Sequence, residues 1–172
     1  MLLTEHRTRP TPAALSMWPL ISEMRLVLLI LFTAMLVVGA AWDCSRRRIP
    51  NELVIALLGA GVVVVAAASG MRGVLTVGVA GAITGLVIWL PLWLMGLMGA
   101  GDVKFFVSAA VWLGPRATLG AALISAIVGG VMGCIWLAIR LRTKSGQAAS
   151  LPYGVAMAVG LAAVGWIPVV MR

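Results

Sequence analysis

The side chains with the clearest capacity for chemistry are Asp43 and Asp102, the two aspartates of the chain. Each borders a long apolar stretch, and an ionisable residue near membrane depth is costly enough to suggest a function. A pair of carboxylates can hydrolyse a peptide bond: the ionised one takes a proton from water, and its protonated partner polarises the scissile carbonyl. The pair shares one proton, because like charges at close range resist simultaneous ionisation. Asp43 and Asp102 are therefore a candidate catalytic pair.

Other ionisable residues offer little competing chemistry. Glu5 and Glu23 lie in the N-terminal region, and Glu52 is well placed in the first turn of a helix that Asn51 would cap. The single histidine, His6, is far from any apolar segment that holds a serine. The chain has no HExxH sequence, and its two cysteines form no CxxC pair, so we expect no metal and no other cofactor.

Each aspartate also has a purely structural interpretation. Asp43 could pair with Arg46 or Arg47 if the helix continues past it. Asp102 could be an ordinary helix cap after Gly101. Both alternatives stay open for either residue taken alone, and a shared location for the two would favour the catalytic interpretation.

Composition decides which elements must position this pair. Hydrophobic residues make up 62% of the chain and charged residues 10%, whereas soluble domains are roughly 45–50% apolar and about 25% charged. Uncharged stretches of about 16–25 residues indicate transmembrane helices. We predict an all-α membrane protein, a polytopic bundle of about six transmembrane helices. A polar N-terminal tail, residues 1–23, would precede an integral-membrane aspartic peptidase domain, residues 24–172.

The helices expected from the apolar stretches cover residues 26–42, 53–68, 74–98, 103–113, 117–139 and 151–171. Pro91 predicts a kink or an early end in the third. The fourth is short for a span, so it either begins inside the preceding glycine-rich turn, thins the bilayer, or is re-entrant. Glycines spaced four apart, at 81/85 and 129/133, predict close contacts between helices.

Basic residues orient the bundle. With the N-terminus outside, the inner connections hold the dense clusters at 46–48 and 140–144 together with Lys104, while the outer basic residues are scattered. This orientation puts both aspartates at the cytoplasmic ends of their helices. The net charge of +8 then serves topology and attraction to anionic lipids. No basic stripe is interleaved with exposed aromatic residues, so we expect no nucleic acid partner.

Three segments resemble signatures of the type IV prepilin leader peptidases. Gly99-Ala100-Gly101-Asp102-Val103-Lys104 is similar to the family's GxGD motif followed by x-K. Asp43 is followed after five residues by Ile49-Pro50-Asn51, as in the second signature, and 151–156 resembles a Pro-aromatic-Gly stretch that opens the last helix. The resemblance covers roughly residues 26 to 170. It is greatest to the short form found in tight-adherence (Flp) pilus systems.

The resemblance implies Asp43 and Asp102 as the catalytic dyad of an aspartic endopeptidase. It adds a set of residues that would border the substrate path or support the site: Gly99, Gly101, Lys104, Ile49, Pro50 and Asn51. The glycines would let a substrate strand approach the backbone closely, and Lys104 would influence the dyad or meet lipid phosphates. Longer relatives carry a cytoplasmic insertion with two CxxC pairs and also N-methylate the cleaved pilin. That insertion is missing here, so we expect no methyltransferase activity.

The expected function is removal of a short basic leader peptide from pilin-like precursors at the cytoplasmic face of a bacterial inner membrane. Its partners would be the prepilin substrate and membrane lipids. A broader intramembrane aspartic peptidase, acting on signal-peptide remnants or archaellin-type precursors, is the alternative among enzymes. The alternative of another class is a small transporter or pilus-assembly scaffold, whose aspartates carry protons or cap helices.

Overall fold

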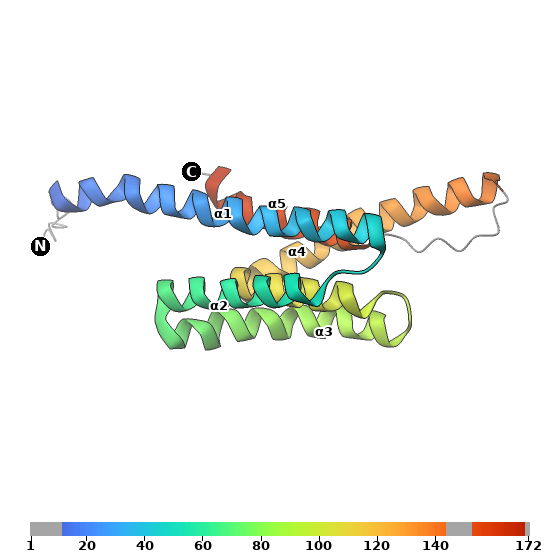
Figure 1. Ribbon diagram of the computed structural model, residues 1–172, viewed down its shortest axis with the longest axis horizontal. Helices are drawn as coiled ribbons and strands as arrows, with labels where there is room; N and C mark the ends of the chain where they lie inside the picture. Colours follow the sequence, from blue (N-terminus) through green and yellow to red (C-terminus); the bar gives the residue numbers. More distant parts are fainter. Residues whose placement is uncertain (1–11, 144–152, 171–172) are drawn as a thin grey trace, which may run out of the picture.

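A computed structural model describes residues 12–143 and 153–170 of the chain, and all the regular structure in these ranges is helical. The helices are α1 (Pro12–Arg46), α2 (Asn51–Gly73), the π-helical segment η1 (Val74–Val79), α3 (Ala80–Leu94), α4 (Ala100–Thr143) and α5 (Tyr153–Val170). The helical runs between loops and breaks lie alongside one another and alternate in direction, with η1 and α3 forming one run (Figure 1). The predicted all-helical class is confirmed.

Three helical stretches are long and apolar enough to cross a membrane: Glu23–Arg46, Asn51–Leu94 and Ala100–Ile139. A shorter apolar helix covers Tyr153–Ile167. The molecule is therefore built as a membrane protein, while the number of six spans stays a prediction. Residues 12–23 of the expected tail belong to α1, and residues 1–11 lie outside the described ranges.

Two glycines interrupt the long helices. Gly70 in α2 has φ 64°, and Gly114 in α4 has φ 74° and ψ 172°. A side chain at such positive φ values is strained, so glycine is the residue that permits these breaks. At its break α4 reverses direction, and its second part runs back along the bundle (Figure 1). Both breaks coincide with boundaries expected between apolar stretches.

Other helix ends differ in detail from expectation. α4 begins at Ala100, inside the glycine-rich turn, which lengthens the short fourth stretch. α3 ends at Leu94, three residues after Pro91, as a proline near a helix end predicts. Asn51 is the first residue of α2 and not its cap; the extended residue before the helix is Pro50.

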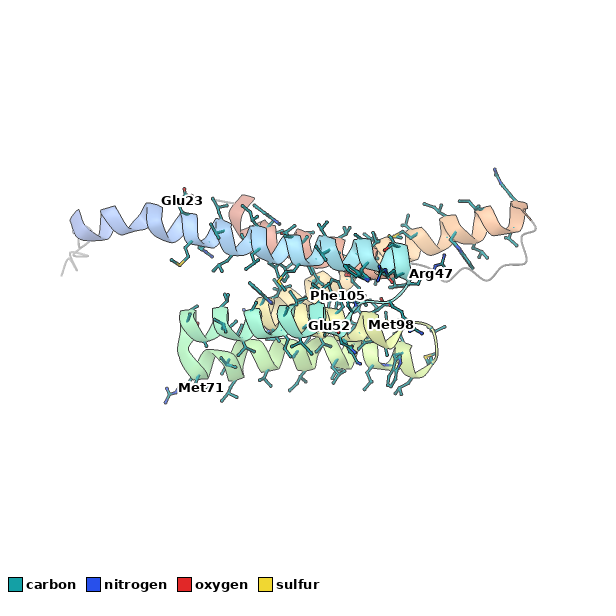
Figure 2. The ribbon with its side chains drawn as sticks, viewed as in Figure 1. Glu23, Arg47, Glu52, Met71, Met98 and Phe105 are labelled. Carbon is teal, nitrogen blue, oxygen red and sulfur yellow. The ribbon has the colours of Figure 1, made fainter. Side chains whose placement is uncertain are left out.

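The core gathers around the first part of α4. Phe105 and Phe106 are fully buried, and Phe105 lies between α1 and α2 (Figure 2). The Phe106 ring packs edge-on against Trp89 of α3, with centroids 5.5 Å apart. The first part of α4 therefore packs against both α1 and α3, and these contacts fix the position of the helix start that carries Asp102.

Small residues allow close approach at two of the expected places. Gly81 and Gly85 of α3 face Ala110 and Phe106 of α4 with no room for a Cβ at Gly81. Gly129 packs against the ring of Tyr153. No described residue comes within 4 Å of where a Cβ on Gly133 would be, so the predicted close contact is not found there among the described residues.

Candidate active site

Asp43 lies in the last complete turn of α1. The Arg47 amide donates to the Asp43 carbonyl oxygen at 2.9 Å, and the φ of 52° at Arg47 then ends the helix. The side chain of Asp43 is 7% exposed. A buried carboxylate needs polar partners, so its neighbours determine what it can do.

Asp102 lies in the first turn of α4. The chain leaves α3 through Gly96, which has φ 72°, and enters α4 after Gly99. The Gly99 amide donates to Asp102 Oδ2 at 3.3 Å, which matches the reciprocal half of a capping box. The capping interpretation of Asp102 therefore holds in this form, although the residue lies inside the helix and not at its cap.

Two neighbouring cavities bring the aspartates together. The first, of about 340 Å³, is lined by Asp43 and Asp102 with Arg47, Arg48 and residues of the 49–51 and 99–104 segments. The second, of about 410 Å³, is also lined by both aspartates and by Arg47, Met98 and Tyr153. Arg47, just after α1, and Met98, just before α4, lie near each other at the border of the second cavity (Figure 2). Carboxylates from α1 and α4 thus border the same two cavities.

Most residues expected to support the site border the first cavity. Ile49, Asn51, Gly99, Gly101 and Lys104 all line it. Ile49 is buried in the core, and its backbone N lies 3.8 Å from where a Cβ on Gly101 would be. The α1–α2 connection and the start of α4 therefore pack directly on one another at this point.

Pro50 does not line either cavity. Its φ of −64° and ψ of 138° make it the extended residue that precedes α2. Proline favours this conformation and fits a position just outside a helix. Its position directs the chain from Ile49 into α2, which is an indirect contribution to the site.

The N-terminus of α5 completes the surroundings of Asp43. The Gly154 amide donates to Asp43 Oδ2 at 2.8 Å, in a buried contact between residues 111 apart in the chain. Tyr153 borders the second cavity. Sequence reasoning did not assign these two residues to the site. The Pro-aromatic-Gly resemblance was the available signal, but nothing in the sequence paired it with Asp43.

The charges around the two aspartates are mixed. Three basic side chains, Arg47, Arg48 and Lys104, share the first cavity with the two aspartates. Among the described residues, no group of three or more His, Cys, Asp or Glu side chains is placed to hold a metal ion. The chemistry that this arrangement offers is that of paired carboxylates in a cationic environment.

A model of the type IV leader peptidase family matches residues 30–134, which include both aspartates and more than half of the chain. The chain belongs to this family. A prepilin leader peptidase/N-methyltransferase from Aeromonas hydrophila is 30% identical over 147 residues, 80% of this chain and 47% of that protein. One from Pseudomonas aeruginosa is 31% identical over 132 residues, 73% of this chain and 42% of that protein.

A third relative with the same description, from Xanthomonas campestris pv. campestris, is 28% identical over 145 residues. The chain spans about half the length of the curated leader peptidases that it matches. No solved structure matches it. Membership of the leader peptidase family thus rests on the sequence match, and the shared cavities of Asp43 and Asp102 come from the structure.

Proposed function

We propose that this chain is a membrane-embedded aspartic endopeptidase that removes the short basic leader from type IV pilin-like precursors. Prepilin precursors are then its substrates and the lipid bilayer its surroundings. The observation that carries the proposal is the presence of Asp43 and Asp102, from α1 and α4, on the same two cavities. Family membership supports the same conclusion, because the matched relatives are described as prepilin leader peptidases.

The proposed reaction uses one proton shared between the two carboxyl groups. The ionised aspartate takes a proton from water, which attacks the scissile carbonyl while the protonated aspartate donates a hydrogen bond to its oxygen. The tetrahedral intermediate then collapses, and the leaving amine receives a proton from the dyad. Each turnover consumes one water and returns the dyad to its starting protonation. No metal or organic cofactor takes part in these steps.

We place the site at the cytoplasmic face of a bacterial inner membrane, in a bundle of six spans. The breaks at Gly70 and Gly114 support this count, because they divide α2–α3 and α4 into paired antiparallel segments. The basic residues Arg47, Arg48 and Lys104 line the same cavity as the dyad. A basic cluster of this kind favours the cytoplasmic side.

Gly99 and Gly101 are the proposed border of the substrate path. A peptide bond must leave its helix before it is attacked, and the unfolded segment needs backbone partners at the membrane edge. Gly99 is exposed and lines both cavities, so a substrate strand can approach its backbone. Ile49, Pro50 and Asn51 support this border from the α1–α2 connection, and Lys104 acts on the dyad or on lipid phosphates.

Cleavage without methylation belongs to the same proposal. This part of the proposal rests on the absence of a CxxC pair: the 172 residues contain two cysteines, and these do not form one. Mass spectrometry of the product checks it: the mature pilin should carry a free N-terminal amine after incubation with S-adenosylmethionine. A gain of one methyl group would contradict this part of the proposal.

A scaffold or transporter remains the second candidate, because both carboxylates make structural hydrogen bonds. Asp43 accepts from Gly154 and Asp102 accepts from Gly99. In a scaffold these contacts would be the whole role of the two residues. Asparagine, which has a carbonyl oxygen in the same place, would then preserve function.

Cleavage assays separate the two candidates. Purified protein in detergent is mixed with candidate prepilins, and wild type is compared with Asp43→Asn and Asp102→Asn. The peptidase proposal predicts loss of cleavage by at least about a thousandfold in each, because an amide cannot replace either proton-transfer role. Glu52→Gln is the matched control: Glu52 is an exposed carboxylate at the start of α2. Retained cleavage in either aspartate variant would reject the dyad.

A further inference from the structure

The first turn of α5 makes a contact with Asp43 that helix packing alone does not require. The Gly154 amide hydrogen bonds to Asp43 Oδ2 at 2.8 Å. A Cβ on Gly154 would lie 2.7 Å from that oxygen and 3.0 Å from Asp43 Cβ. Such distances are too short for a real Cβ, so glycine is what lets the α5 backbone reach the carboxylate.

Tyr153, the residue before Gly154, is held from two sides. Its ring packs edge-on against Trp89 of α3, with centroids 6.4 Å apart and an interplanar angle of 72°. On the other side it lies against Gly129 of α4, where a Cβ would be 2.8 Å from the Tyr153 Cζ. The ring therefore fixes the start of α5 between α3 and α4, and the position of the Gly154 amide follows from it.

We propose that Gly154 is a positioning residue for Asp43, and that Tyr153, seated between Trp89 and Gly129, fixes the α5 turn that carries it. The effect of this positioning on cleavage rests on the proposed peptidase function. An unanchored carboxylate samples several rotamers, whereas the Gly154 hydrogen bond selects one that faces the cavities shared with Asp102. A displacement of about 1 Å in a reacting group can cost on the order of a hundredfold in rate.

Kinetic tests use two pairs of matched glycine substitutions. Gly154→Ala is compared with Gly165→Ala in the same helix, where a Cβ meets Phe32 at an ordinary 3.5 Å. Gly129→Ala is compared with Gly130→Ala, where no described residue lies within 4 Å of the new Cβ. We expect kcat for prepilin cleavage to fall at least about tenfold in the first member of each pair, with KM changed less than about twofold.

A purely structural role would give a different pattern. It predicts a lower melting temperature and a smaller active fraction, with the same kcat for each folded molecule. Measuring kcat on monodisperse protein, with the active molecules counted, distinguishes a smaller active fraction from a lower kcat for each folded molecule. An unchanged kcat per folded Gly154→Ala molecule would overturn the inference.

A spectroscopic test needs no substrate. Because the chain has two aspartates, labelling with aspartate carrying ¹³C at the side-chain carboxyl gives two carboxyl NMR signals, which Asp43→Asn assigns. We expect the Asp43 signal to move in Gly154→Ala and in Gly129→Ala, and to stay in place in both control variants. The three atoms nearest to a Cβ on Gly129 all belong to Tyr153. A change of the Asp43 signal in Gly129→Ala must therefore be transmitted through Tyr153 and the first turn of α5.

The two readouts also separate this inference from the proposed function. An Asp43 signal that stays in place in folded Gly154→Ala and Gly129→Ala overturns the positioning role, even if wild type cleaves prepilin. A signal that moves, in a wild-type protein that cleaves no prepilin, supports the positioning of Asp43 and rejects the peptidase. If Gly154→Ala does not fold, Gly129→Ala carries the test.

Discussion

The indole of Trp112 connects two helices through a single hydrogen bond. Its Nε1 donates to the Leu57 carbonyl oxygen at 2.9 Å, across 55 residues of chain, and its ring lies 5.2 Å from that of Phe32. A Cβ on Gly61 would be 2.7 Å from the same indole, so glycine admits the ring to α2. In a membrane such contacts replace the hydrophobic driving force that lipid removes.

Replacing Trp112 with phenylalanine keeps an aromatic ring and removes the donor. We expect the free energy of unfolding to fall by about 0.5–1.7 kcal/mol, the usual range for an interhelical hydrogen bond. Unfolding of purified protein in mixed micelles by denaturant measures the change. Trp93→Phe is the matched control, because Trp93 is 42% exposed at the end of α3. Equal effects at the two positions would contradict the role given to the Trp112 hydrogen bond.

At the scale of the elements, the reversal within α4 depends on Gly114. Its φ of 74° and ψ of 172° lie in a region that glycine alone occupies readily. The Thr118 hydroxyl donates to the Gly114 carbonyl oxygen at 2.7 Å, in a buried contact that ties the turn to the following helix. After the reversal, the second part of α4 packs along α5, where Gly129 lies against Tyr153.

Gly114→Ala should therefore destabilise the protein by about 1–3 kcal/mol through backbone strain alone. The new Cβ would also lie 2.9 Å from Val77 Cγ1. A lower thermal unfolding midpoint in detergent is the measurement. Gly133→Ala in the same helix is the control, because the space around Gly133 is open; it should unfold at or above the wild-type temperature. Unchanged stability of Gly114→Ala would argue against the reversed conformation.

In α2 and in the first part of α4, the cavity of the two aspartates borders one end and the glycine break forms the other. Asp43, Asn51, Gly99 and Asp102 share a cavity at the first end. Arg72 and Arg116 follow the breaks at the opposite end. If the bundle crosses the membrane six times, these two arginines face away from the cytoplasm.

Cysteine labelling tests this arrangement in whole cells. After replacement of the exposed Cys44 and Cys134 with serine, single cysteines are introduced as Glu52→Cys, Arg72→Cys and Arg116→Cys. A membrane-impermeant maleimide should label the two arginine positions in intact cells, and Glu52→Cys only after permeabilisation. Labelling of Arg116→Cys only after permeabilisation would show that the first part of α4 does not cross the membrane.

Several properties could be predicted from the amino-acid sequence because they depend on local chemistry. Long uncharged stretches require helices, since a backbone in lipid must satisfy its own hydrogen bonds. Gly114 and Pro91 ended helices near the expected places, because their effects on the backbone are intrinsic. The rarity of aspartate in an apolar chain pointed to Asp43 and Asp102, although their catalytic role stays a prediction.

The contacts of those aspartates could not be predicted, because they depend on how each helix is rotated about its axis. In water an apolar stripe shows which face of a helix is buried. In lipid both faces are apolar: Phe105 is fully buried, whereas Leu119, further along the same helix, is 56% exposed. Without an apolar stripe to show the buried face of each helix, the sequence could not predict the hydrogen bond from Gly154 to Asp43. That contact depends on how α1 and α5 pack in the tertiary structure.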